Sequence, residues 1–208
     1  MGFFITLEGG EGTGKSTQAK RLGDYLRKAG HDVVQTREPG GTPEAEVLRE
    51  LLVRGEPGRW SAEAEALLNY TARDHHLNHL IRPALSRGSW VVCDRFMDST
   101  RVYQCYAGGC PKELVDALEK AIVKDTHPNL TLIFDLEPSA GLARANGRTS
   151  GGGDRYERKG LSFHEKLRKG FAMIAASESS RCKVIDAAQD EDSVFAAVLK
   201  HVEALSHG

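Results

Sequence analysis

The stretch that most constrains this chain is Gly9-Gly10-Glu11-Gly12-Thr13-Gly14-Lys15-Ser16, which matches the phosphate-binding pattern G-x-x-x-x-G-K-S. In such a loop, small residues let backbone N–H groups surround an anion, the lysine adds a positive charge, and the serine hydroxyl is available to Mg²⁺. The apolar run at residues 3–7 predicts a buried strand before the loop, and apolar residues at helical spacing over 19–29 predict a helix after it. This order predicts a nucleotide-binding site formed by residues 9–17.

The rest of the chain alternates between strand and helix patterns. Further strands are expected at residues 31–36, 90–93, 130–136 and 183–185, with helices between them. One long helix is expected to begin after Ser61, its cap, and to end or kink at Pro83. The alternation predicts a single α/β domain over residues 1–208, with a parallel sheet covered by helices on both faces. Ligands in such a sheet bind at the carboxyl ends of the strands.

Charge and cysteine content exclude several classes of function. The 28 basic and 29 acidic residues nearly balance, so no overall field favours nucleic acid or a membrane surface. No apolar run reaches membrane-spanning length, and the first residues do not show the pattern of a signal peptide. The four cysteines form no C-x-x-C pair, which is typical of reduced thiols. We therefore expect a cytoplasmic protein with no nucleic-acid or membrane partner.

Charged residues follow two of the expected strands. Asp94 ends an apolar strand, as a Walker B carboxylate does, which predicts a Mg²⁺ ligand there; a surface acid is the alternative. Arg95 beside it has a planar guanidinium suited to phosphate. Arg37, Arg49 and Arg73 extend the set. Each alone is more typical of a solvated surface, but together they suggest a second phosphorylated ligand beside the first.

Three further arginines, Arg144, Arg148 and Arg155, flank the glycine-rich segment 150–153. Flexible chain that carries arginines predicts a lid at about residues 145–160, which closes over phosphates and excludes water. A solvated loop is the alternative.

Two pairs of side chains are less informative. His75 and His79 lie four residues apart, but the chain has no H-E-x-x-H pattern, which favours ordinary surface histidines over a metal site. Tyr103 and Tyr106 are compatible with the core or with stacking on a base.

Together these residues resemble the thymidylate kinase family, in its bacterial type. The resemblance covers essentially the whole chain and rests on the phosphate-binding loop, on Arg37-Glu38-Pro39-Gly40-Gly41 between two threonines, on Asp94-Arg95-Phe96, on Ser99 with Tyr103-Gln104, and on Asp154-Arg155-Tyr156-Glu157. It implies a P-loop NTPase three-layer sandwich with strand order 2-3-1-4-5 and a short lid. It also implies Mg²⁺-dependent transfer of the ATP γ-phosphoryl group to thymidine 5′-monophosphate (dTMP), giving dTDP and ADP in dTTP synthesis, by a homodimer.

The resemblance also implies roles for individual residues. ATP would be bound by Gly9, Gly10, Glu11, Gly12, Thr13, Gly14, Lys15, Ser16 and Thr17, with Arg144 against adenine. Ser16 and Asp94 would hold Mg²⁺. The acceptor nucleotide would be bound by Glu11, Arg37, Arg49, Asn69, Arg73, Arg95, Ser99, Thr100, Tyr103 and Gln104. The catalytic groups would be Lys15, Arg95, Glu11 and a lid arginine, Arg148 or Arg155, because Gly12 stands where some members carry a catalytic arginine in the loop.

Three positions depart from the family pattern. Asn69 stands where members usually have a phenylalanine that stacks on thymine, a contact worth about 1–3 kcal/mol. Cys105 and Gly108 replace a frequent glycine and a frequent arginine. Another nucleoside monophosphate kinase, or a deoxynucleoside kinase, with an altered base preference is therefore the alternative function. A GTP-dependent switch is disfavoured by the lack of an N-K-x-D element, and a non-catalytic module by the intact phosphate-binding and metal-binding residues.

Overall fold

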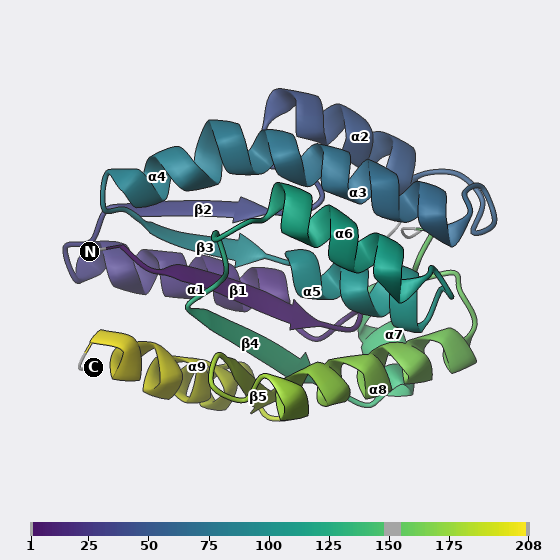
Figure 1. The fold of residues 1–208 in the computed structure, drawn as a ribbon. Coiled ribbons are helices and arrows are strands. Elements are labelled where there is room, and N and C mark those ends of the chain that lie inside the picture. Colours follow the sequence, from purple (N-terminus) through teal and green to yellow (C-terminus); the bar gives the residue numbers. More distant parts are fainter. Residues whose placement is uncertain (1, 148–154, 207–208) are drawn as a thin grey trace.

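The computed structural model describes residues 2–147 and 155–206 and contains a five-stranded parallel sheet with strand order β2-β3-β1-β4-β5 (Figure 1). The strands are β1 (Phe4–Gly9), β2 (Val33–Arg37), β3 (Trp90–Asp94), β4 (Leu130–Asp135) and β5 (Cys182–Asp186). The helices are α1 (Lys15–Lys28), α2 (Pro43–Val53), α3 (Ala62–His76), α4 (Arg82–Ser86), α5 (Met97–Thr100), α6 (Lys112–Ile122), α7 (Pro138–Asn146), α8 (Leu161–Ser177) and α9 (Glu191–Ser206). The predicted fold and strand order are confirmed.

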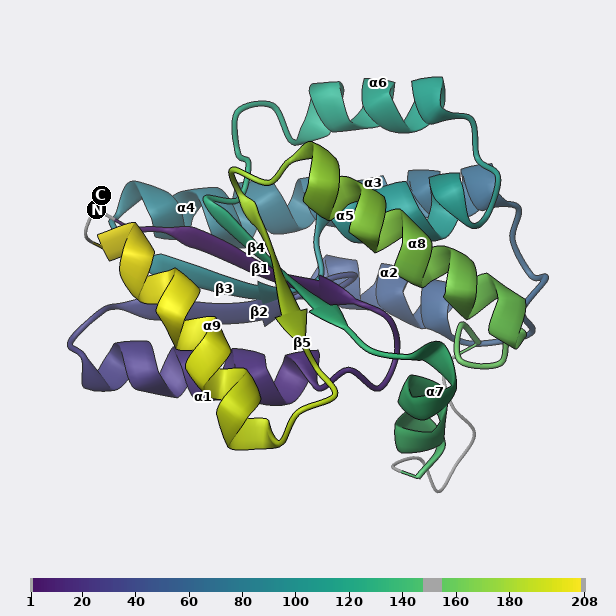
Figure 2. The ribbon, with the colours of Figure 1, turned by 90° about the horizontal axis from the view of Figure 1, so that it is seen from below.

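Helices cover both faces of the sheet, as Figure 2 shows, with α1 and α9 on one side and α3, α4, α5 and α8 on the other. The alternation of side chains along each strand divides the core accordingly. From β1, Ile5 and Leu7 join the cluster packed with α1 and α9, whereas Phe4 packs on the opposite face. Both sides of β1 are fully buried, as expected for a central parallel strand.

The predicted long helix after Ser61 begins as expected, but Pro83 is not its end. Its start is confirmed, because the Ser61 hydroxyl accepts a hydrogen bond from the Ala64 N–H at 3.1 Å. Pro83, however, does not end the helical path, which runs from α3 through a π-helical segment (Leu77–Ile81) into α4. Pro83 follows the π-helical segment, at whose end the Arg82 N–H donates to the Leu77 carbonyl, so the N–H that proline lacks falls where the path changes from π-helix to α-helix.

Strand register brings the expected site residues to one edge of the sheet. Asp94 at the end of β3 pairs with Leu7 of β1 on one side and with Arg37 of β2 on the other. Because these strands are parallel, the loops that follow them leave the sheet at the same edge. Within the described ranges, no helix combines the length and apolar character needed to cross a membrane.

Candidate active site

The phosphate-binding loop connects β1 to α1. Gly14 has φ 87° directly before the first residue of the helix, Lys15. The ammonium of Lys15 lies over the loop and donates to the Gly10 carbonyl at 2.6 Å and to the Thr13 hydroxyl at 3.1 Å. Burial and the nearby charge of Arg95 lower the pKa of Lys15 to about 8. The strand, loop and helix predicted around this motif are therefore present.

Gly12, where the family resemblance allows an arginine, lies in close contact with α7. Gly12 has φ 69°, and a Cβ at this position would lie 1.9 Å from the backbone carbonyl oxygen of Gly141 in α7. A Cβ on Gly141 would in turn meet the Glu11 carbonyl oxygen at 2.4 Å. The loop and α7 thus approach each other at two glycines, and a side chain at position 12 would need the backbone to move.

The two predicted Mg²⁺ ligands lie together. The Ser16 hydroxyl at the start of α1 donates a hydrogen bond to the Asp94 carboxylate at 2.5 Å. Both groups are oxygen donors, which Mg²⁺ prefers, and Mg²⁺ commonly takes only one or two protein ligands and completes its shell with phosphate and water. In the described part of the chain, no group of three or more His, Cys, Asp or Glu side chains is arranged to hold a metal. His75 and His79, whose rings stack at 3.8 Å, are not such a site.

A cavity of about 400 Å³ joins the loop to the arginines, and we call it the P-loop cavity. Among its lining residues are Glu11, Gly12, Thr13, Gly14, Lys15, Ser16, Arg37, Arg49, Asn69, Arg73, Asp94, Arg95, Ser99, Thr100, Tyr103 and Gln104. The structure therefore brings together the lysine and four of the arginines that the sequence placed after different strands and on different helices. Gly9, Gly10, Thr17, Arg144 and Arg155 are not among the lining residues.

Arg95 lies closest to the loop. Its guanidinium donates to the Gly9 carbonyl and to the Glu11 carboxylate, each at 2.9 Å. Glu11 also accepts a hydrogen bond from the Tyr103 hydroxyl at 2.7 Å. Burial alone would raise the pKa of Glu11, but the charges of Arg95 and Lys15 and the Tyr103 hydrogen bond outweigh it and lower that pKa to about 2. Glu11 is therefore a carboxylate at neutral pH and holds Arg95 in place.

The other three arginines are held by different partners. Arg73 of α3 is buried, donates to the Glu38 carboxylate at 2.7 Å and to the Thr100 hydroxyl at 3.1 Å, and has one guanidinium nitrogen, Nη1, with no hydrogen-bond partner among the described residues. Arg37 pairs with Glu46 at 3.1 Å on the surface, and Arg49 donates to the Pro39 carbonyl at 2.8 Å. The loop 38–41 and the start of α2 therefore position this end of the cavity.

Arg155 is not where a lid residue was expected. Its side chain is completely buried, with an ion pair to Glu65 at 2.8 Å, and it donates to the backbone carbonyls of Leu52 and Pro57. Because these partners fix the guanidinium between α2 and α3, it does not reach the phosphate-binding loop. The other arginine predicted to act from a lid, Arg148, and most of the predicted lid lie outside the described residues, so both stay predictions.

Arg144 and Thr17 line a separate hollow of about 550 Å³ beside the loop. This hollow is bounded by α1, α7 and the segment after β5, and Arg144 crosses it to donate to the Ala187 carbonyl at 3.0 Å. It adjoins the loop on the side away from the arginine cluster, so two ligands that meet at the loop would enter from different sides.

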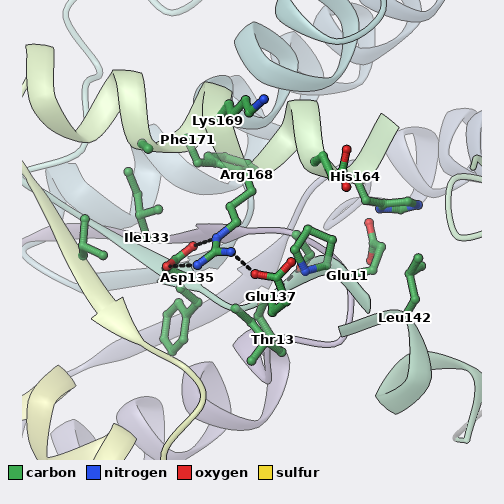
Figure 3. A pocket seen from close by; sticks show the side chains of 17 residues that line it. Glu11, Thr13, Ile133, Asp135, Glu137, Leu142, His164, Arg168, Lys169 and Phe171 are labelled. Atoms are coloured by element: carbon green, nitrogen blue, oxygen red, sulfur yellow. Dashed lines mark hydrogen bonds and ion pairs between the residues drawn. The ribbon is translucent and has the colours of Figure 1, made fainter. Parts of the chain in front are cut away.

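A larger cavity of about 630 Å³ lies between α8 and the end of β4 (Figure 3). Its main cation, Arg168, is already paired with both carboxylate oxygens of Asp135, at 2.7 and 3.0 Å, and also with Glu137. Figure 3 shows the Glu11 side chain and the His164 ring pointing toward each other at its edge. Although this cavity is larger, the P-loop cavity is the candidate site, because Lys15 and four arginines converge there beside the phosphate-binding loop.

Several acids that organise the site were given no role from the sequence. Glu8, Glu38 and Glu65 are all buried, and each binds a residue of the site: Ser99, Arg73 and Gln104 respectively. One signal was available for Glu8, because an acid within a run of buried apolar strand residues must find a partner. The partners of Glu38 and Glu65 lie 35 and 39 residues away, and no local pattern identifies them.

The open question on the tyrosines is resolved by burial. Tyr103 packs edge-on against Tyr156, Phe163 and Phe171 while its hydroxyl reaches Glu11, so it belongs to both core and cavity. Tyr106 is exposed.

Comparisons with known proteins identify the family of this chain. The family model described as "Thymidylate kinase" matches residues 7–198. The chain is 56% identical to a thymidylate kinase of Caulobacter vibrioides, over 95% of this chain and 94% of that protein, and 49% identical to one of Ruegeria pomeroyi, over 97% and 94%. A crystal structure of a thymidylate kinase from Ehrlichia chaffeensis superposes with a TM-score of 0.79 at 33% identity, covering 97% of this chain and 98% of that one. With matches of this identity over nearly its full length, the chain belongs to the thymidylate kinase family.

Proposed function

We propose that this protein transfers the γ-phosphoryl group of ATP to dTMP, giving dTDP and ADP, and so acts in dTTP synthesis. The observation that carries the proposal is the P-loop cavity, where Lys15 and four arginines converge beside the loop. Two polyanions that meet there have their mutual repulsion neutralised. The names of the relatives support dTMP as the acceptor.

The ATP side is assigned to the loop and the hollow beside it. Backbone N–H groups of residues 9–17 and the N-terminus of α1 bind the phosphates, and the Lys15 ammonium moves from the Gly10 carbonyl to the outer phosphates. Adenine lies against Arg144 in the hollow that reaches Ala187. Ser16 and Asp94 hold Mg²⁺, which when bound supplies positive charge to the donor phosphates.

The acceptor side is assigned to the arginines. Arg95, Arg37 and Arg49 bind the acceptor phosphate, and Arg95 is held beside the loop by Glu11. An oxygen of that phosphate is already anionic near neutral pH, so it attacks without a general base. The contribution of these side chains is to hold two anions in line and at reacting distance. Arg148 of the lid remains the candidate for a further catalytic charge.

Base recognition is assigned to the far end of the cavity. Arg73 keeps a free donor, Nη1, while Glu38 and Thr100 fix its guanidinium, so it is suited to donate to a thymine carbonyl. Thr100, Tyr103 and Gln104 line the sugar and base, and Gln104 is held by Glu65 at 2.8 Å. Asn69 also lines the cavity, but its amide donates back to the Glu65 carbonyl of its own helix at 2.8 Å. An aromatic surface is therefore missing at this position, and a different nucleoside monophosphate remains the second candidate acceptor.

A coupled assay for ADP tests the proposal. The purified protein is given ATP and Mg²⁺ with no acceptor, with each of dTMP, dUMP, dCMP, dGMP, AMP and UMP, and with thymidine. The proposal expects dTMP to give the highest kcat/KM and the acceptor-free rate to be negligible. A higher kcat/KM with another monophosphate or with thymidine contradicts the assigned substrate, and acceptor-independent ADP release contradicts the kinase.

We also propose a cytoplasmic homodimer. The resemblance to bacterial thymidylate kinases supports it, and large apolar side chains, Val47 of α2 and Leu67 of α3, are exposed on neighbouring helices. Light scattering after size exclusion should give about twice the chain mass of 22.7 kDa. A single-chain mass at micromolar concentration contradicts the dimer.

A further inference from the structure

Glu8 is an acid in the middle of the buried sheet. It lies on the central strand β1, has no exposed surface, and contacts the segment that forms α5. Its carboxylate accepts hydrogen bonds from the Phe96 N–H at 2.8 Å, the Ser99 N–H at 3.3 Å and the Ser99 hydroxyl at 2.6 Å. An ionised group so far from water must be held by specific partners, and all three come from the segment that follows β3.

That segment carries Arg95 in an unusual backbone conformation. Arg95 has φ 71°, a region that residues with a side chain rarely adopt, and the chain turns there from β3 into α5. Phe96, at the cap position of α5, makes no side-chain cap hydrogen bond. Glu8 supplies the missing cap from a different strand, because its carboxylate accepts from two of the first N–H groups of the turn. The turn that presents Arg95 is thus tied to β1.

A second link runs through the Ser99 hydroxyl. A hydroxyl has one proton, and in Ser99 that proton is donated to Glu8. Its lone pairs are then free to accept from Nη1 of Arg95, at 3.2 Å. Nη1 also donates to the Gly9 carbonyl, and Nη2 to Glu11. The direction of each hydrogen bond therefore follows from the one before it, in the order Arg95 to Ser99 to Glu8.

We propose that Glu8 is a positioning residue that orients the Arg95 guanidinium toward the acceptor phosphate, through the Ser99 hydroxyl and the capped turn. The inference rests on the proposed function, in which Arg95 binds that phosphate. Glu8 itself does not touch the substrate. Glu8 restricts the orientation of the Arg95 guanidinium. Its replacement is therefore expected to change kcat/KM for the acceptor and to leave KM for ATP nearly unchanged.

Protonation of Glu8 reverses the chain of hydrogen bonds. A protonated carboxyl donates to Ser99, whose own proton then points toward Arg95, a donor that cannot accept it. Burial, followed by the charge of Asp98, raises the pKa of Glu8 to about 7, while Ser99 and Arg95 act in the opposite direction. The charged and titratable groups that act on Glu8 or on which it acts are Asp98, Arg95, Lys15, Arg73, Cys93 and Cys182. The orientation of Arg95 is expected to weaken as the pH falls below about 7.

The test is the isosteric variant Glu8→Gln, assayed with ATP and dTMP from pH 6 to pH 9. Its amide donates to Ser99 at every pH, so kcat/KM for dTMP should fall about 10- to 100-fold at pH 8, the loss of a hydrogen bond to a charged group. KM for ATP should change less than about twofold, well below that loss. The wild-type-to-variant ratio should shrink as the pH falls toward 6, and the ionisation of dTMP cancels in this ratio.

Two further variants separate positioning from general damage. Thr6→Val removes the buried hydrogen bond to Thr131 (2.8 Å) from the same face of β1, and it should lower the melting temperature while leaving kcat/KM for dTMP unchanged. Ser99→Ala removes the link, so adding Glu8→Gln to it should cost much less than in the wild type.

Each outcome decides one question. If Glu8→Gln keeps the wild-type kcat/KM and pH profile while Arg95→Ala loses activity, the role of Glu8 is refuted and the proposed function stands. If Arg95→Ala is itself fully active, the assigned acceptor site is refuted. If Glu8→Gln does not fold, Ser99→Ala decides. The inference is supported if the wild-type-to-variant ratio of kcat/KM for dTMP shrinks as the pH falls from 8 to 6, and it is overturned if this ratio is the same at every pH.

Discussion

The placement of Arg155 leads to a prediction that separates structure from catalysis. The residue was expected on the lid, yet it forms a completely buried ion pair with Glu65, whose side chain is 3% exposed. Replacing Arg155 by methionine keeps most of the apolar length but leaves the Glu65 carboxylate without its charge partner in the interior. We expect Arg155→Met to damage stability first and activity only as a consequence.

The expected size follows from the contacts. Breaking a buried pair by removing one partner costs about 3–5 kcal/mol, because an uncompensated charge stays behind. Arg155 also donates to the carbonyls of Leu52 and Pro57 and to the Tyr156 hydroxyl, which lose a partner at the same time. For a chain of this size, that free energy lowers the melting temperature by about 6–20 °C.

Thermal unfolding at pH 7, followed by circular dichroism, measures the effect, with kcat determined well below the melting temperature. A matched control is Arg158→Met, three residues on, where an exposed arginine pairs with an exposed Glu56 at 3.5 Å. Such surface pairs contribute about 0–1 kcal/mol, so this variant should melt within a few degrees of the wild type. In Arg155→Met combined with Glu65→Gln, the loss should be smaller than the sum of the single losses.

One result would refute this reasoning. The refuting result is an Arg155→Met variant that melts within 2 °C of the wild type but has a kcat lower by more than about 100-fold, which raises the activation free energy by ~2.7 kcal/mol. Arg155 would then act on the phosphoryl group, and its buried position would not be the one used in turnover.

Three further predictions concern the P-loop cavity. Because burial and Arg95 lower the pKa of Lys15 to about 8, kcat/KM for ATP should decline as the pH rises from 7 to 9 and the ammonium loses its proton. In Lys15→Arg, kcat/KM for ATP should not change over this pH range, because the guanidinium stays protonated. An equal decline in the wild type and the variant contradicts the assignment. Gly12→Ala should lower kcat/KM for ATP by about tenfold or more, because its Cβ would lie 1.9 Å from the Gly141 carbonyl oxygen and its φ is positive. Gly10→Ala, which has open space around the Cβ, should lose much less kcat/KM for ATP, and equal losses in the two variants contradict the clash. Asn69→Phe should lower KM for dTMP by about 5- to 100-fold through stacking on the base, and an unchanged KM in steady-state assays contradicts this site for thymine.

Much of the site was predictable because its parts are local in sequence. The phosphate-binding loop is a contiguous pattern, and the apolar runs that flank it specify a strand and a helix from periodicity alone. Asp94 and Arg37 were predictable as neighbours because both end parallel strands, and the register pairs them directly. The alternation of strands and helices also predicts the single edge at which these residues meet, whereas the strand order was expected only from the resemblance to the thymidylate kinase family.

The tertiary structure decided which charged side chains remain available to a ligand. Arg95 and Arg155 are the same residue type and both form ion pairs. Glu11 holds Arg95 in the P-loop cavity, whereas Glu65, ninety residues away in the chain, holds Arg155 in the interior. Likewise, the close approach of Gly12 and Gly141, and the role of Glu8 beneath Arg95, depend on which elements pack together. A sequence pattern determines what a residue is able to bind. Whether its charge is free, paired or buried depends on partners far along the chain, because the free energy of a charge is set by everything that surrounds it in the folded state.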